Sequence, residues 1–107
     1  MSLLKARQHF TQMLALFLRA AYTRGESPAL DFVKRCEDCP VGKPNSVHKV
    51  GLAADVHLYD SQGNYLGQGE EMVRRHTSLH GLWDTMGGAP RIPDDLNHYS
   101  LPWGGMR

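Results

Sequence analysis

A single apolar stripe in the first 25 residues constrains the fold most strongly. Apolar side chains recur there at the three- and four-residue spacing of one helix face, at Phe10, Met13, Leu14, Phe17 and Ala21. Gly25 follows as a natural stop signal. A helix with one apolar face must bury that face against a second layer of structure, so we expect this helix to pack on a sheet.

The rest of the chain predicts short strands and one further helix. Strand-like runs cover 29–33, 52–59 and 98–101, a return strand is expected to start at 64, and a helix is expected over 69–86. Gly87 and Gly88 end that helix, and Trp83 and Met86 are expected in the core. This order predicts an α+β fold, with helices flanking a small antiparallel sheet.

Length and composition limit the possible functions. The chain has 107 residues, which predicts one domain over 1–107. Twelve basic residues oppose eleven acidic ones, and a net charge of +1 argues against a nucleic-acid partner. No apolar run approaches the length of a membrane span, and no signal peptide is evident, so we expect synthesis in the cytoplasm. The only cysteines, Cys36 and Cys39, are half of a zinc site, a redox pair or two plain thiols.

Histidines and aspartates form the pattern with the clearest chemical meaning. Asp55 lies in an otherwise apolar run, seven residues after His48, and a lone carboxylate is costly to bury unless a partner receives it. Asp95 precedes His98 by three residues. Two histidines and a carboxylate form a catalytic zinc set with one position open for water, and Asp95 would serve as the base. The alternative is that both histidines are ordinary surface or hydrogen-bonded core residues.

Two motifs resemble those of a known enzyme family. The first is the run Ser46-x-His48-x-x-Gly51-x-Ala53-x-Asp55, and the second is Asp95-x-x-His98. Together they are similar to the signature of the M15 zinc peptidases, which include D-Ala-D-Ala carboxypeptidases and dipeptidases and phage endolysins that cleave the L-alanyl-D-glutamate bond of peptidoglycan. The resemblance covers nearly the whole chain and implies the fold of the hedgehog and D-Ala-D-Ala peptidase proteins.

The resemblance also implies roles for individual residues. It implies zinc ligands at His48, Asp55 and His98, with Asp95 as general base and acid. Arg35 matches the place of an arginine that stabilises the oxyanion or binds substrate, with a solvated surface arginine as the alternative. Cys36 departs from the family pattern directly after it. Ser46 is expected near the ligands or as a turn cap, and Tyr99 as a substrate contact or a packing residue.

Four further side chains have competing interpretations. Asp94 is an alternative base to Asp95, but the three-residue spacing to His98 favours Asp95. His57 lies two residues after Asp55 and is either a side chain beside the ligands or in a pocket wall, or an ordinary partly exposed histidine, which is the favoured interpretation. His76 and His80 are one helical turn apart and are expected on the helix surface.

The sequence thus predicts a zinc-dependent peptidoglycan peptidase. The resemblance implies an L-Ala-D-Glu endopeptidase of phage or prophage lysis, monomeric, dependent on a holin for release and acting on the cell wall in the periplasm. The alternatives are a D-Ala-D-Ala carboxypeptidase or dipeptidase, and a non-catalytic zinc-stabilised module associated with the cell wall or a phage tail. Another divalent ion in place of zinc is a further alternative.

Overall fold

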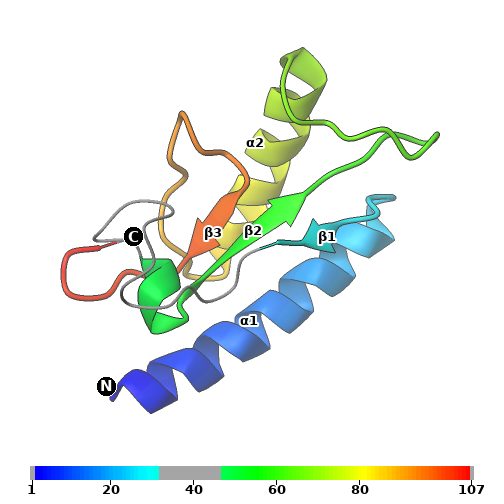
Figure 1. Cartoon of the computed structure of the whole chain (residues 1–107). Helices are drawn as coiled ribbons and strands as arrows, with labels where there is room; N and C mark the ends of the chain where they lie inside the picture. Colours follow the sequence, from blue (N-terminus) through cyan, green and yellow to red (C-terminus); the bar gives the residue numbers. More distant parts are fainter. Residues whose placement is uncertain (1, 32–46, 107) are drawn as a thin grey trace.

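The computed structural model describes residues 2–31 and 47–106. Two long helices, a short 3-10 helix and three strands follow one another along this part of the chain (Figure 1). In order they are α1 (Leu3–Thr23), β1 (Ala29–Leu30), η1 (Val47–Val50), β2 (Ala53–His57), α2 (Glu70–Thr85) and β3 (His98–Ser100). The predicted α+β class is confirmed. The finer expectation of a hedgehog-like fold stays a prediction.

The first helix forms where the apolar stripe predicts it. The Ser2 side chain caps its N-terminus by accepting a hydrogen bond from the Lys5 backbone N–H at 3.2 Å. All five stripe residues are buried. The helix ends at Thr23, and Gly25 follows with a φ of +94°, in the left-handed region that glycine favours.

The sheet is antiparallel, with β2 between β1 and β3. Ala29 pairs with His57 at one edge, and Asp55 pairs with His98 at the other. The predicted return strand from 64 is not a strand of this sheet. A single bridge joins Tyr59 to Tyr65 instead, and backbone hydrogen bonds from Asp60 N–H to the Asn64 carbonyl and from Leu66 N–H to the Leu58 carbonyl accompany it.

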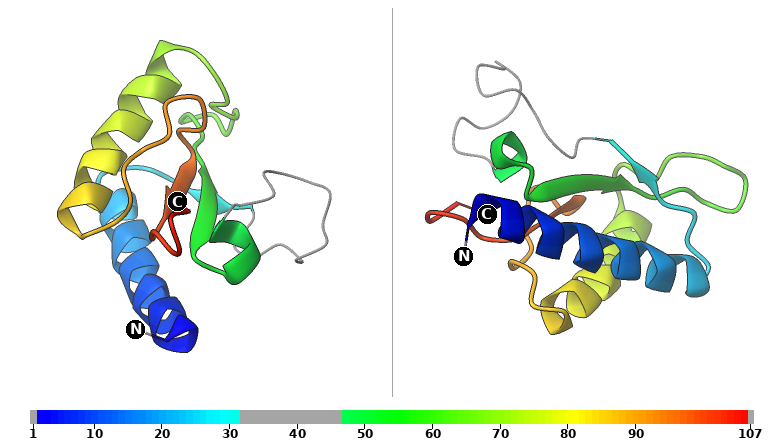
Figure 2. Two further views of the ribbon diagram at one scale, coloured as in Figure 1. Left: turned by 90° about the vertical axis from the view of Figure 1, so that its left-hand side faces the viewer. Right: turned by 90° about the horizontal axis from the view of Figure 1, so that it is seen from below.

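Both long helices cover the same face of the sheet, and η1 lies on the other side (Figure 2). The core between the helices and the sheet contains edge-on aromatic contacts of Phe10 and Phe17 with Trp83, and a contact of Phe17 with Tyr99. The indole N–H of Trp83 donates to the Ser100 carbonyl at 2.9 Å, which joins α2 to β3. This packing leaves the opposite face of β2 and β3 available for polar side chains.

A membrane-spanning helix is not found in residues 2–31 and 47–106, since neither long helix combines sufficient length with sufficient apolar character.

Candidate metal centre

Three buried side chains converge at one point, two of them seven residues apart in the sequence and the third more than 40 residues further on. The His48 Nε2 atom lies 3.0 Å from Asp55 Oδ1 and 3.2 Å from His98 Nδ1, and the last two atoms are 3.8 Å apart. Every one of these residues is less than a tenth exposed. The three ligand atoms all lie within 4.8 Å of one another, so the group could hold a metal ion.

The register of the sheet brings two of these side chains together. Asp55 and His98 are direct cross-strand partners on β2 and β3, and side chains of such a pair lie on the same face. Tyr99, the next residue on β3, therefore lies on the opposite face, among the helices. Alternation along β3 thus separates the polar centre from the aromatic core.

The third side chain is supplied by η1, which α1 and a tight turn hold in place. Arg7 on α1 donates from Nε to the Val50 carbonyl at 2.7 Å. Gly51 then turns the chain into β2 with a φ of +75°, and a Cβ there would lie 3.2 Å from the Arg7 guanidine. Glycine is therefore favoured at this position both by backbone conformation and by space. This turn places His48 over Asp55 although only seven residues separate them.

The two histidines stabilise the ionised form of Asp55. Burial alone would raise the pKa of this carboxyl, but hydrogen bonds from His48 and then His98 outweigh burial and lower the pKa well below its ordinary value. An ionised carboxylate is the form of Asp55 that binds a metal ion.

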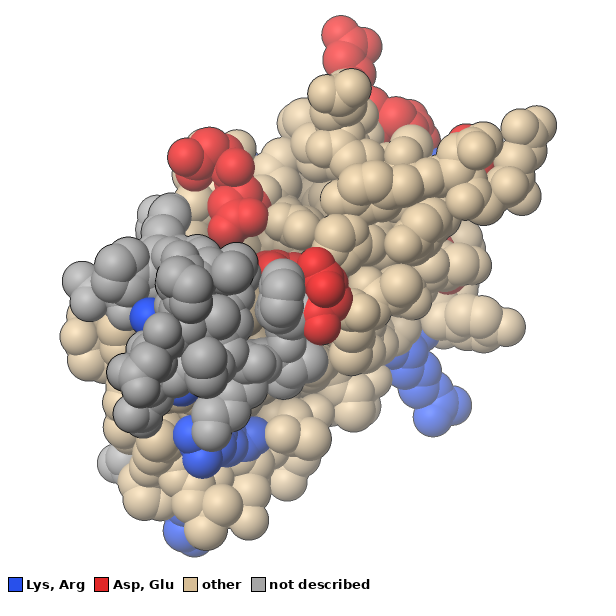
Figure 3. Space-filling view, viewed as in Figure 1, with Lys and Arg blue, Asp and Glu red and all other residues tan. Residues whose placement is uncertain are grey.

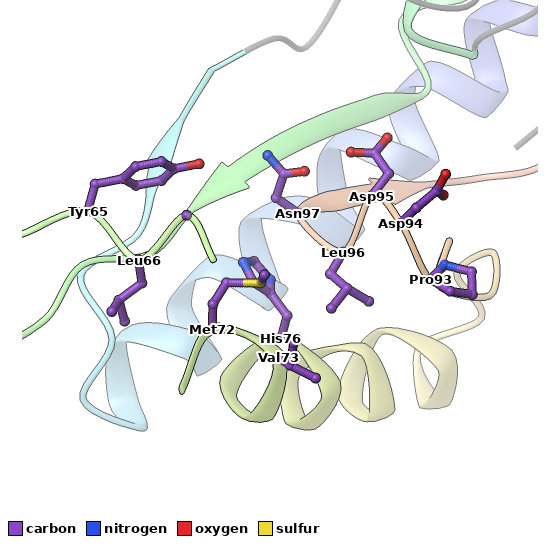
Figure 4. A pocket seen from close by; sticks show the side chains of 11 residues that line it. Tyr65, Leu66, Met72, Val73, His76, Pro93, Asp94, Asp95, Leu96 and Asn97 are labelled. Atoms are coloured by element: carbon purple, nitrogen blue, oxygen red, sulfur yellow. The ribbon is translucent and has the colours of Figure 1, made fainter. Parts of the chain in front are cut away.

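Asp95 lies at the exposed side of the centre. Its Oδ2 atom is 3.9 Å from His98 Nδ1, and 43% of its side chain is accessible to solvent. Asp94, the alternative base, is exposed and lies on the same loop before β3 (Figure 4). Among the described ion pairs, Asp95 has one with His98 and Asp94 has none with it. The geometry thus favours Asp95 as the carboxylate of this site.

Some of the other residues predicted for the site lie in the described part of the chain, and some do not. Arg35 and Ser46, like Cys36 and Cys39, lie outside the described residues, so their roles stay predictions. His57 is partly exposed, as predicted, and its Nε2 atom lies 3.2 Å from an Asp31 carboxylate oxygen.

The expectation that Tyr99 contacts substrate is wrong. Its side chain is fully buried and stacks on His80 at a centroid distance of 4.1 Å, and its hydroxyl lies 2.7 Å from His76 Nδ1. Burial raises the pKa of this hydroxyl above its ordinary value. Tyr99 is therefore a packing residue behind the centre, which was the alternative interpretation.

The expectation that His76 and His80 lie on the helix surface is also wrong. Each is only 1% exposed. Burial lowers the pKa of both, and for His76 the value falls to about 4. Their spacing to Leu79 and Trp83 completes an i, i+3, i+4, i+7 stripe, which is the signal that indicates burial.

His80 also makes a contact that sequence reasoning missed. Its Nε2 atom lies 2.7 Å from the Leu96 carbonyl oxygen, which can only accept, so Nε2 carries the proton and donates. Leu96 directly follows Asp95 in the chain. His80 therefore ties the loop that carries the candidate base to α2.

Comparisons with known proteins add no family assignment. No protein-family model, no curated protein and no solved structure matches the chain.

Proposed function

We propose that the protein is a zinc-dependent peptidase that cleaves the stem peptide of peptidoglycan. The convergence of His48, Asp55 and His98, with the carboxylate of Asp95 beside them, is the observation that supports this proposal most. Two histidines and one carboxylate, with a further position open, form the ligand set of catalytic zinc sites. The substrate class is inferred from the resemblance of the two motifs to M15 peptidases.

The spacing of the ligand atoms supports zinc as the ion. Zinc binds nitrogen and oxygen at about 2.0–2.1 Å, and a tetrahedral arrangement then separates its ligand atoms by about 3.3 Å. The three separations in the structure are 3.0, 3.2 and 3.8 Å. Only small side-chain adjustments would bring them to this geometry. Calcium instead prefers six to eight oxygen ligands, which makes it a poorer fit to this donor set.

The mechanism assigns proton transfer to Asp95. A zinc ion held by the three ligands would activate water for attack on the peptide carbonyl. Asp95 takes a proton from the attacking water and delivers it to the leaving amine. Its exposed position next to His98 allows it to reach both. Arg35 is the proposed partner of the negative charge that develops on the carbonyl oxygen.

We propose that the biological role is lysis by a phage or prophage. After its release to the cell wall, the protein would cleave the L-Ala-D-Glu bond. The test is to incubate purified protein with peptidoglycan, with and without a chelator, and to identify the released fragments by mass spectrometry. New L-alanine carboxyl ends that disappear with the chelator and return with zinc would support the endopeptidase. Release of free D-alanine would still support the zinc site, but it would identify the D-Ala-D-Ala bond as the one that is cleaved.

Asp95→Asn is the variant that distinguishes catalysis from binding, and Asp84→Asn on exposed α2 surface is its control. Both should bind zinc, but only the control should release fragments. Absence of fragments from folded, zinc-loaded wild-type protein would overturn the peptidase proposal in favour of a binding module.

A further inference from the structure

A pocket of about 280 Å³ lies between α2 and the loop before β3, and none of the three candidate metal ligands lines it (Figure 4). Its apolar part is formed by Leu66, Met72, Val73, Pro93 and Leu96. Pockets for drug-sized ligands range from about 300 to 1,000 Å³, so this one is at or below the lower end. It suits a smaller ligand, such as a single ring with a short substituent.

Two carboxylates lie at the pocket without facing its apolar wall. In Figure 4 the side chains of Asp94 and Asp95 point away from the α2 side, with Leu96 between them and that side. A cation bound against α2 would therefore find no partner for its charge. Acidic side chains also gather over this loop and near the start of α2 on the face seen in Figure 3, so an anion would be repelled. The pocket thus favours a neutral ligand.

His76 supplies a polar atom in this apolar setting. It lines the pocket although only 1% of it is exposed, and in Figure 4 it extends from α2 on the same side as Met72. Its Nδ1 atom lies 2.7 Å from the Tyr99 hydroxyl. Its Nε2 atom has no hydrogen-bond partner in the described part of the chain and, unlike Nδ1 of His80, is not fully enclosed. Nε2 is therefore the atom that His76 offers to a ligand.

The contact with Tyr99 determines which nitrogen of His76 carries the proton. Tyr99 is fully buried. If Nδ1 donated to its hydroxyl oxygen, the hydroxyl hydrogen would be buried without an acceptor among residues 2–31 and 47–106, which is costly. The hydroxyl therefore donates to Nδ1. Burial lowers the pKa of His76 to about 4, so the ring is neutral at pH 7 and its one proton is on Nε2, which donates.

We propose that this pocket binds a small neutral ligand that presents a carbonyl oxygen to the Nε2–H group of His76. The apolar part of the ligand lies against Met72 and Val73, and its carbonyl oxygen accepts the hydrogen bond. The site does not include the candidate metal ligands. The inference does not rest on the proposed function, and it holds whether or not the protein cleaves peptides.

The first test reads the position of the proton directly. Nitrogen-15 NMR of the histidine rings distinguishes a protonated from an unprotonated ring nitrogen. At pH 7, His76 should have its proton on Nε2 and an unprotonated Nδ1. A proton on Nδ1 would overturn the proposal, because Nε2 would then be an acceptor and would repel a carbonyl oxygen.

The second test compares three probes that share one aromatic ring. Acetophenone is neutral and has a carbonyl group, benzoate is an anion, and benzylammonium is a cation. Each is titrated into protein labelled at the methionine methyl groups, and the Met72 signal is followed by NMR, with Met13 in the core as the reference. Acetophenone should bind most tightly and shift Met72 but not Met13. Equal or tighter binding of either charged probe, or no shift at Met72, would overturn the site.

Two variants of His76 separate the donor from the shape of the pocket. The amide of His76→Asn can accept from Tyr99 near the position of Nδ1 but does not reach that of Nε2, whereas His76→Gln places an amide N–H near Nε2. Acetophenone affinity should fall about two- to ten-fold in His76→Asn, the effect of one neutral hydrogen bond, and should change by less than about two-fold in His76→Gln. The exposed control Thr77→Ala should bind like wild type.

Wild-type affinity in folded His76→Asn would show that Nε2 does not hold the ligand and would overturn the proposal. Circular dichroism checks that each variant is folded. The proton position and the probe series need only wild-type protein, so they decide the proposal even if a variant does not fold.

Discussion

Asp55 and His98 are direct partners across β2 and β3, although 43 positions separate them in the sequence. Their side chains lie on the sheet face opposite the helices, with Oδ1 and Nδ1 3.8 Å apart. A shift of one residue in this register would turn His98 into the helical core and Tyr99 toward the candidate metal centre. The candidate site therefore depends on the register of a single strand pair.

Metal affinity should depend on Asp55 in particular. We expect Asp55→Asn to weaken zinc binding at least about 100-fold, because even loss of an outer partner of a metal ligand costs about 10- to 100-fold. Isothermal titration calorimetry measures this, with exposed His9→Ala as the control. In wild type, zinc at 100 times its Kd should raise the free energy of unfolding by about 2.7 kcal/mol. Equal affinity of Asp55→Asn and wild type would contradict the ligand assignment.

Asp95→Asn should separate catalysis from metal binding. A positioned acid–base group contributes about 10²- to 10⁴-fold to rate, so kcat should fall by that factor while zinc affinity stays within a few-fold of wild type. Steady-state kinetics on a stem peptide and a zinc titration measure the two effects. A variant that retains full kcat would assign the base elsewhere, with Asp94 as the next candidate.

His80 should position the loop that carries the base. His80→Leu leaves the half-buried Leu96 carbonyl without its donor, and the loss of this hydrogen bond should cost about 1 kcal/mol of stability. We also expect a lower kcat with nearly unchanged zinc affinity, because Asp95 adjoins Leu96. His80→Gln retains an N–H donor and should recover part of the rate. Loss of stability with full kcat in His80→Leu would limit this residue to a structural role.

His76 should make the fold less stable in mild acid. Its pKa is about 4 in the folded protein, chiefly through burial, against an ordinary value of 6.5. Between these values the unfolded chain binds a proton that the folded protein does not, so stability falls as pH drops from about 6.5 to 4. One proton gives a slope of at most about 1.4 kcal/mol per pH unit.

Urea unfolding of His76→Gln measures this contribution, with a chelator present so that metal release does not contribute. The variant should show a shallower loss of stability over this range than wild type. The exposed control His9→Gln should retain the wild-type slope. A His76→Gln slope identical to that of wild type would exclude His76 as the source.

Two glycines near the end of α2 should respond oppositely to alanine. A Cβ at Gly88 would overlap the Trp83 indole, whose N–H donates to Ser100, so Gly88→Ala should destabilise the fold by about 1–3 kcal/mol. Gly81 lies within the helix with open space around it, so Gly81→Ala should stabilise by about 0.5–1 kcal/mol. Thermal unfolding of the pair measures both effects. Similar effects of the two substitutions would contradict the close packing of Gly88 on Trp83.

The sequence alone predicted both long helices, the three strands and the residue types of the candidate site. The stripe from Phe10 to Ala21 specified α1, because a helical period leaves one face that must be buried. The lone carboxylate of Asp55 in an apolar strand indicated a buried partner, and histidines are the partners found. These inferences needed only residue type and spacing.

The tertiary structure decided which side chains meet and which way they face. Spacing places His76 and His80 on the same face of α2 as Leu79 and Trp83, and packing against Tyr99 is what buries both histidines. The strand register, likewise, separates His98 from Tyr99, and the turn at Gly51 brings His48 over Asp55. Such contacts join residues far apart in the chain, and local periodicity carries no information about them, because register and helix docking are set by the packing of the whole core.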